Sequence, residues 1–344
     1  MRIEDFDYSL PPELIAQEPT QERTASRLLV LRRDGSAPEH RTFRELNELL
    51  APGDLLVANS SRVFPARLLG RRRGGGSAEV LLVADEGGGL WQALVRPSRR
   101  LRAGDEVAIG PRLRVRVISP AADSHGRRLV RLDAEGCDAA SALERYGLVP
   151  LPPYIRRLPR PDDAERYQTV FARERGSIAA PTAGLHFTND LLADLAARGV
   201  AWATIVLHVG PGTFAPVRAS HVAGHRLPPE SFVVSGESAA AVRETRRRGG
   251  RVIAVGTTAA RVLETVARND GCIEPSAGQT TLVVVPGFRF RVVDSLVTNF
   301  HLPRSSLLLL VAAFAGRESV LNAYREAVCR RYRFYSYGDA MLIL

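Results

Sequence analysis

Between residues 63 and 136 the chain is broken into short runs in which apolar and polar residues alternate. Runs such as "AEVLLVADE", "DEVAIG" and "LRVRVIS" recur about every ten residues, with Gly-rich turns between them. Each run can bury one face only, so several of them must close around a common core. This pattern is typical of a small antiparallel barrel or sandwich.

Outside that segment, apolar strand-like runs alternate with helical patterns. The helix-like residues 189–199 lead into an apolar run at 200–209, and residues 237–250 lead into 251–256. Such alternation predicts a sheet with helices on its faces. We therefore expect a mixed-sheet three-layer α/β domain, discontinuous over residues 1–62 and 152–344. A small antiparallel β-barrel domain is inserted at 63–151, and the five prolines of residues 150–163 mark the return linker.

The charge of the chain comes from an unusual set of side chains. The net charge is +10 and the sequence contains no lysine, so arginine is the only basic residue apart from histidine. An excess of arginine favours an anionic partner, above all nucleic acid. The lack of lysine excludes a Schiff base and a P-loop, because both need an amine. Proton transfer must then fall to His, Asp, Glu, Tyr or Cys.

Cysteine usage and hydropathy predict a cytoplasmic protein with no membrane segment. Cys137, Cys272 and Cys329 are far apart and form no CxxC pair, which argues against disulfides and cysteine zinc sites. The longest apolar run, residues 307–315, is half the length of a membrane span. The N-terminus shows no signal-peptide pattern. We expect a monomer.

Three histidines share one context. His186, His208 and His301 each close an apolar run just before a Gly, Pro or Thr turn. One such histidine is usually a satisfied core residue, but three indicate a site. His221 and His225 have the i, i+4 spacing of a helical metal site, yet Gly224 lies between them and no carboxylate is suitably spaced. No metal is expected.

Two glycine-containing turns are candidate ligand loops. In "GPGTFA" (210–215), Gly210, Gly212 and Glu230 imitate a dinucleotide-binding fingerprint, but Pro216 stands where the helix should begin. The second turn, "VIAVGTTAARVLE" (252–264), ends a buried strand at Gly256 and begins a helix at Thr257 or Thr258. Free amides at such a helix start suit an anion or a polar ligand edge. An ordinary strand–helix turn is the alternative.

The C-terminal "RRYRFYSYGDAMLI" (330–343) interleaves arginines with aromatic residues. Such a segment either stacks bases and holds phosphates, or forms a helix end that runs into an edge strand.

Taken together, the motifs resemble one family, the S-adenosylmethionine:tRNA ribosyltransferase-isomerases of queuosine biosynthesis. The resemblance rests on "APTAGLHFT", "LHVGPGTFAPV", "GTTAARVLE", "TNFHLPRSSLLLLVAAFAG" and "YRFYSYGDAMLI", and it covers essentially the whole chain. It implies an α/β domain with an inserted β-barrel. It also implies transfer and isomerisation of the ribosyl part of S-adenosylmethionine onto 7-aminomethyl-7-deazaguanine at a tRNA wobble position. No cofactor beyond the substrate S-adenosylmethionine is implied.

The resemblance also implies a set of site residues. His186, His208 and His301 are expected to serve as base, acid and orienter, with the individual roles open. Thr257, Thr258 and Arg261 are expected to hold the ribose or the methionine carboxylate, and Asp339 to face the sulfonium. The remaining candidate substrate-binding residues are Asn59, Arg62, Thr182, Gly184, Gly210, Gly212, Thr213, His225, Glu230, Gly256, Asn299, Arg304 and Tyr337.

Four positions depart from the family pattern. Ser60, Leu148, Pro228 and Val285 stand where the family has aspartate, histidine, histidine and tyrosine. These departures keep a second hypothesis open, in which the ribosyl unit goes to a small-molecule acceptor instead of tRNA. A third hypothesis is a catalytically silent RNA-binding protein, and a fourth is a metal-dependent hydrolase.

Overall fold

The computed structural model describes residues 1–119, 122–123, 126–210 and 221–344. One mixed sheet of nine strands carries most of the chain. Its strands, in spatial order, are β15 (Ser276–Thr280), β13 (Glu230–Val234), β12 (Ala201–Leu207), β3 (Leu55–Asn59), β14 (Val252–Val255), β16 (Ser295–Asn299), β17 (Ala340–Ile343), β1 (Arg27–Leu31) and β2 (Glu39–Thr42).

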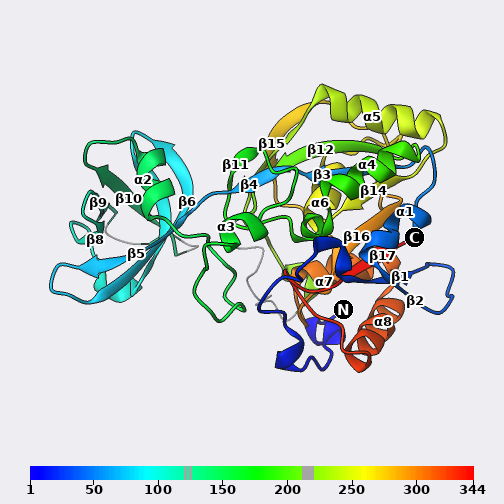
Figure 1. The fold of residues 1–344 in the computed structure, drawn as a ribbon, viewed down its shortest axis with the longest axis horizontal. Helices are drawn as coiled ribbons and strands as arrows, with labels where there is room; N and C mark the ends of the chain where they lie inside the picture. The colour runs from blue at the N-terminus through cyan, green and yellow to red at the C-terminus, as the bar shows by residue number, and fades with distance from the viewer. Residues whose placement is uncertain (120–121, 124–125, 211–220) are drawn as a thin grey trace.

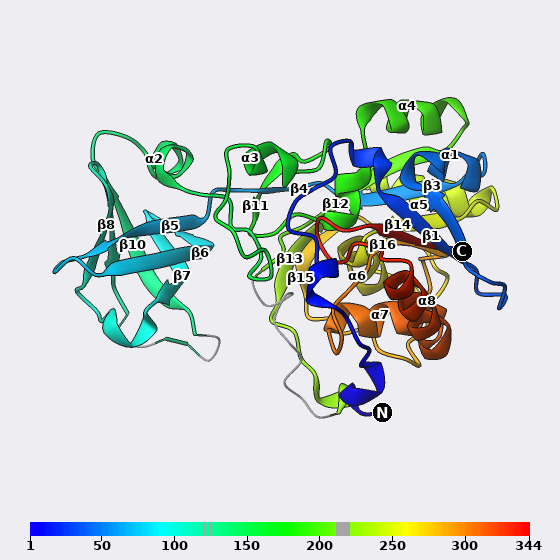
Figure 2. The same ribbon diagram turned by 60° about the horizontal axis from the view of Figure 1, so that its bottom comes forward.

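Helices cover both faces of this sheet, which gives the three layers expected from the sequence (Figure 2). Helices α1 (Leu46–Leu49) and α4 (Asn189–Ala197) pack on one face. The other face carries α5 (Gly236–Arg247), α6 (Thr257–Thr265), α7 (Ser306–Ala315) and α8 (Arg317–Cys329). Along β3 and β14, alternate residues point to the two cores, and all of them are buried. Burial on both faces explains why these strands read as unbroken apolar runs.

Four neighbouring strands set the position of the candidate site. β12, β3, β14 and β16 run parallel to one another. Their carboxyl ends therefore meet at one edge of the sheet, where ligands bind in open α/β folds. β17 is antiparallel to β16, and Asn299 lies opposite Ala340, so the segment before β17 reaches the same edge.

A second lobe is a closed six-stranded barrel (Figure 1). It comprises β5 (Arg67–Arg72), β6 (Ser77–Gly87), β7 (Leu90–Arg96), β8 (Glu106–Gly110), β9 (Leu113–Val117) and β10 (Arg128–Ala134), with α2 (Ala139–Tyr146) beside it. Every pairing in the barrel is antiparallel. The "LRVRV" of β9 alternates buried and exposed residues as predicted. The fold class expected from the sequence is thus confirmed.

A narrow connection joins the two lobes. β4 (Ser61–Val63) leaves the sheet toward the barrel, and after the chain has come back past α3 (Asp163–Arg166), β11 (Glu174–Ser177) pairs with β4 and runs parallel to it (Figure 1). The remaining elements are short 3-10 turns: η1 (Ile3–Phe6), η2 (Pro12–Leu14), η3 (Arg23–Ala25), η4 (Phe43–Glu45), η5 (Ser98–Arg100), η6 (Thr182–His186) and η8 (Val222–Gly224). In the described part of the chain, no single helix is long and apolar enough to cross a membrane. The pair α7 and α8 meets that test only jointly, across a bend of 115°.

Candidate active site

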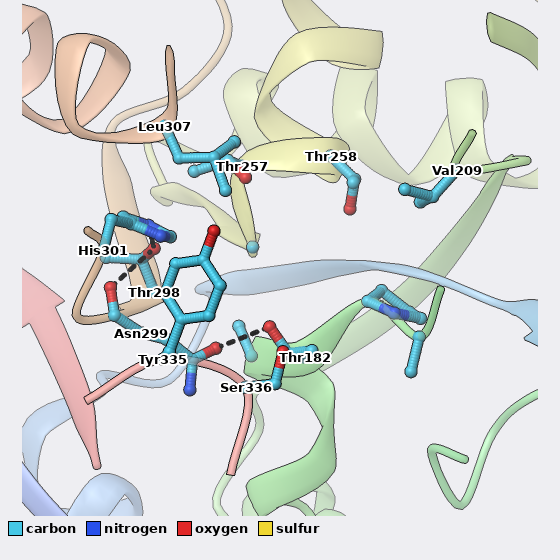
Figure 3. A pocket seen from close by; sticks show the side chains of 14 residues that line it. Thr182, Val209, Thr257, Thr258, Thr298, Asn299, His301, Leu307, Tyr335 and Ser336 are labelled. Atoms are coloured by element: carbon cyan, nitrogen blue, oxygen red, sulfur yellow. Dashed lines mark hydrogen bonds between the residues drawn. The ribbon is translucent and has the colours of Figure 1, made fainter. Parts of the chain in front are cut away.

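A pocket opens at the carboxyl ends of the parallel strands (Figure 3). It holds about 470 Å³ of space free of protein atoms, open solvent included. The described residues that line it are Ala180, Pro181, Thr182, Ala183, Val209, Gly256, Thr257, Thr258, Thr298, Asn299, His301, Leu307, Tyr335 and Ser336.

The start of α6 supplies one wall of the pocket. Gly256 follows β14 with φ of +90°, a conformation that favours glycine, and no side chain caps the helix. The first amides of α6 are therefore free to bind an anion. Thr258 is 7% exposed, and its buried Oγ1 has no hydrogen-bond partner among the described residues. This end of the pocket is thus built to hold a polar, negatively charged group.

The opposite wall contains a strained tyrosine that sequence reasoning missed. Tyr335 has φ of +75°, which is costly for a bulky residue, and its amide donates to the Phe300 carbonyl at 3.0 Å. Its ring lies in the pocket wall between Asn299 and the α6 side in Figure 3. Strain of this kind is concentrated at functional sites.

His301 lies in the pocket wall, and its ring is 5% exposed. Its Nε2 is 2.8 Å from Thr298 Oγ1, and that hydroxyl in turn donates to the Asn299 carbonyl at 3.4 Å. Because the hydroxyl proton of Thr298 points to the Asn299 carbonyl, Thr298 Oγ1 accepts from His301 Nε2. Nε2 therefore carries the ring proton, and Nδ1 is the acceptor. Nδ1 has no partner among the described residues. Burial lowers the pKa of His301 to about 3, so the ring is neutral at physiological pH.

His186 lies behind the pocket wall, not in it. Asn299 Nδ2 donates to Nε2 at 3.0 Å, and Nδ1 lies 2.8 Å from Ser26 Oγ, which donates to the Arg23 carbonyl. The Asn299 Oδ1 accepts from Thr182 Oγ1 at 3.0 Å (Figure 3). Both ring nitrogens are therefore used inside the protein. Burial, with Arg333 and Arg23, lowers the pKa of His186 to about 3.

The two buried histidines predict how stability depends on pH. Their pKa values lie near 3 in the folded chain and near about 6.5 in the unfolded chain. Between these pKa values the unfolded chain binds more protons than the folded chain. The free energy of unfolding that the two histidines contribute is therefore highest above pH ~6.5 and falls as the pH drops. We expect each histidine to contribute roughly 1 kcal/mol per pH unit to the free energy of unfolding over this window. Urea unfolding at several pH values measures the slope, and His186→Gln should reduce it.

The other two candidate histidines, His208 and His225, lie apart from His301 and His186. The ring of His208 packs against Gly176, where an added Cβ would lie 2.7 Å from the ring Cε1. Burial lowers the pKa of His208, and Glu174 opposes that shift. His225 follows η8 and is partly buried, which lowers its pKa. Neither is among the described residues of the pocket wall. The three expected catalytic histidines thus share no single crevice.

Gly210, Glu230 and Arg261 form a buried frame beside the pocket. Arg261 Nη1 pairs with Glu230 Oε2, and both side chains are at most 5% exposed. Gly210 N donates to Glu230 Oε1 at 3.0 Å, and Arg261 Nε donates to the Leu282 carbonyl. The pair joins β13 and α6 to the segment after β12, and both α6 and that segment supply pocket residues, Thr257, Thr258 and Val209. Gly212 and Thr213 lie outside the described residues.

Two further candidates have their polar groups bound within the protein. Asn59 is fully buried and bonds to the backbone of Leu207 and Ser61. Asp339 is 2% exposed and accepts from Arg27 and from the Arg333 amide. Both connect strands at the edge of the sheet that carries the pocket. The carboxylate oxygens of Asp339 are held by these groups, and Asp339 is not among the described residues of the pocket wall.

Four more candidates lie away from the pocket wall. Tyr337 donates to Asp163 at 2.8 Å, and Arg304 is exposed beside Asp7. Arg62 is exposed on β4. Gly184 allows close packing, because an added Cβ would lie 2.6 Å from the ring of Phe171.

Of the candidate residues, His301, Thr182, Gly256, Thr257, Thr258 and Asn299 do line the pocket. Sequence reasoning missed Ala180, Pro181, Ala183, Val209, Thr298, Leu307, Tyr335 and Ser336. All eight lie inside the family motifs. Five of them have small or apolar side chains without a chemical signal of their own, and the three polar ones, Thr298, Tyr335 and Ser336, stand among several similar residues in their motifs. Among the described residues, no group of three or more His, Cys, Asp or Glu is placed to hold a metal.

Comparisons with known proteins agree with this fold and identify the family. The family model described as "Queuosine biosynthesis protein" matches residues 3–343. An S-adenosylmethionine:tRNA ribosyltransferase-isomerase of Anaeromyxobacter sp. (strain Fw109-5) is 56% identical, over 100% of this chain and 99% of its own length. A protein of the same name from Moorella thermoacetica is 52% identical over the full length of both chains.

A solved structure is similar as well. The crystal structure of S-adenosylmethionine tRNA ribosyltransferase from Thermotoga maritima has a TM-score of 0.57 and is 43% identical, over 99% of this chain and 100% of its own. The match of fold and sequence extends over essentially the whole chain. The chain therefore belongs to the queuosine biosynthesis protein family.

Proposed function

We propose that this chain is an S-adenosylmethionine:tRNA ribosyltransferase-isomerase. It transfers and isomerises the ribosyl part of S-adenosylmethionine onto 7-aminomethyl-7-deazaguanine at the tRNA wobble position. Epoxyqueuosine-tRNA forms, and adenine and methionine leave. The observation that carries the proposal is a pocket at the strand ends that combines a neutral histidine with a free helix start, in a chain of this family. The reaction takes place in the cytoplasm, where tRNA is found.

His301 is the proton acceptor in this proposal. The positive sulfonium acidifies the ribose carbon next to it, so a neutral base in the pocket can remove that proton. His301 is neutral, lies in the wall and has a free Nδ1. The proton that His301 takes passes to the departing adenine, the acceptor amine forms a bond to the ribosyl unit and loses a proton to solvent, and methionine leaves as a neutral thioether. Thr182 and Asn299 present hydrogen-bonding groups to the sugar or the adenine.

The methionine carboxylate binds at the start of α6, where the free amides and Thr258 Oγ1 can donate hydrogen bonds to an anion. We expect Thr258→Val to raise the KM for S-adenosylmethionine about 2- to 10-fold with kcat little changed, because one hydrogen bond is lost. Steady-state kinetics with the decarboxylated form of the substrate provides the control. Equal losses with both substrates would contradict this placement.

His186 acts as a positioning residue. Its Nε2 accepts from Asn299 and so holds the amide with Oδ1 toward Thr182. We expect His186→Ala to lower kcat about 10- to 100-fold, since the amide can then rotate and the buried Nδ2 loses its acceptor. The pH profile of kcat/KM should keep its shape. A profile that loses a titration step in His186→Ala would instead make this ring a proton-transfer group.

The direct test is incubation with S-adenosylmethionine and tRNA that carries 7-aminomethyl-7-deazaguanine, followed by mass spectrometry. Epoxyqueuosine with matching adenine supports the proposal, whereas adenine without modified tRNA would mean another acceptor. No observation favours a small-molecule acceptor. Ser60 is buried against β12, Leu148 pairs with Arg67 and Val285 packs on the core. None of the four departures is a described residue of the pocket wall.

A further inference from the structure

A large groove lies between the barrel and the segment that returns from it. Strands β5, β6 and β7 with η5 supply one wall, and residues 150–158 supply the other. In Figure 1 these elements face each other across the neck that joins the lobes. The groove holds about 2350 Å³ of space free of protein atoms, open solvent included, whereas the pocket at the strand ends holds about 470 Å³. An extended ligand can therefore lie along it.

The charge of the groove is strongly positive. Its described lining contains one glutamate, Glu79, and six arginines, which are Arg67, Arg96, Arg99, Arg128, Arg156 and Arg157. Three of the six have internal partners: Arg67 pairs with Glu79, Arg157 with Asp163, and Arg128 binds the carbonyls of Ser98 and Leu101.

The other three arginines are available to a ligand. Arg96, Arg99 and Arg156 are exposed, and their guanidinium groups have no ion pair or hydrogen bond among the described residues. Arg96 and Arg99 come from the barrel side, and Arg156 comes from the opposite wall. Guanidinium groups on two sides of a groove can grip successive phosphates bidentately.

One segment of the chain lines both the groove and the candidate active site. Ile178 and Ala179 line the groove, and the next residues, Ala180 and Pro181, line the pocket. The groove and the pocket therefore lie on either side of one short stretch of backbone. An enzyme that modifies a base must take that base out of its stack and hold the neighbouring backbone.

We propose that this groove binds the sugar–phosphate backbone of tRNA next to the nucleotide that enters the pocket; this inference rests on the proposed function. Arg96, Arg99 and Arg156 contact phosphates. Leu158, which is 66% exposed, and Pro153, which is also exposed, give the groove an apolar surface for ribose or unstacked bases. The barrel thus acts as one side of an RNA clamp.

The test compares two triple variants of the full-length protein. Arg96→Gln/Arg99→Gln/Arg156→Gln removes the groove charges. Arg73→Gln/Arg112→Gln/Arg114→Gln removes the same charge from exposed arginines that do not line the groove. Filter binding of tRNA over a series of NaCl concentrations gives the affinity and its salt dependence. Calorimetry with S-adenosylmethionine provides a readout that does not involve RNA.

We expect the groove variant to bind tRNA about tenfold or more weakly, with a slope of log K against log[salt] reduced by about 2 to 3, since each phosphate contact contributes about 0.7–0.9. The control variant should keep most of the slope, and both should bind S-adenosylmethionine normally. Equal tRNA affinities and slopes in the two variants would overturn the proposal.

The failure of this inference and that of the proposed function can be told apart. If the wild-type protein modifies tRNA and the groove variant does so with unchanged affinity, the groove assignment falls and the function stands. If only the groove variant binds tRNA more weakly, but the wild-type protein releases no adenine, the groove is confirmed as the RNA-binding site and the proposed reaction is wrong.

Discussion

His301→Ala should lower the rate of ribosyl transfer by about 10²–10⁴-fold, the usual contribution of a positioned general base. The ring is in the pocket wall, its Nε2 is held by Thr298, and its Nδ1 is free among the described residues. Removing it leaves no other histidine in the described pocket wall. Single-turnover measurement of adenine release separates this step from product release.

The control for this variant is His221→Ala, which removes an exposed histidine away from the described pocket wall and should keep near-wild-type activity. S-adenosylmethionine affinity, measured by calorimetry, should change little in His301→Ala. A His301→Ala variant that turns over normally would remove the ring from the mechanism.

The pH dependence of the reaction tests the same assignment. Because burial lowers the pKa of His301 to about 3, the ring stays in its proton-accepting form as the pH falls from 8 to 5. We therefore expect no acid limb of kcat/KM near pH 6.5 that depends on His301. Such a limb, present in the wild-type protein and absent in a His301 variant, would mean that the ring titrates as an exposed histidine does.

Glu230→Ala should destabilise the protein by about 3–5 kcal/mol, because it leaves the buried guanidinium of Arg261 without its counter-charge. The two side chains are 3–4% exposed. Loss of Glu230 also leaves the amide of Gly210 without its acceptor. The free energy of unfolding in urea measures the change.

Two controls make the stability prediction specific. Glu274→Ala breaks an exposed pair with Arg268, whose side chains are 56% and 62% exposed, and should cost less than about 1 kcal/mol. The apolar double variant Glu230→Leu/Arg261→Met should be less destabilised than Glu230→Ala, since it removes both charges. A Glu230→Ala protein within about 1 kcal/mol of wild type would show that Arg261 finds another partner.

Much of the architecture could be predicted because it depends on local periodicity. A strand in the barrel wall has one buried face, so "LRVRV" alternates. A strand in the centre of the main sheet has two, so "VIAV" is apolar throughout. The start of α6 was also predictable, since Gly256 and the threonines after it mark a strand–helix turn.

The candidate site was predictable in part. Thr257, Thr258, Asn299 and His301 were expected and line the pocket. His208 was expected beside them on equal grounds, yet it packs on Gly176. In the sequence the two histidines look alike, because each ends an apolar run. The direction in which a ring points after a strand depends on what packs against it.

The sequence by itself determined the two lobes, the helix start at α6 and the family, because short-range patterns and long motifs suffice for these. Only the tertiary structure decided the roles of the histidines. Whether an imidazole is a proton acceptor or a fixed support depends on which groups meet its two nitrogens. For His186 those groups are Ser26 and Asn299, 160 and 113 residues away along the chain. No local pattern records contacts over such separations, and they form only when the sheet brings its strand ends together.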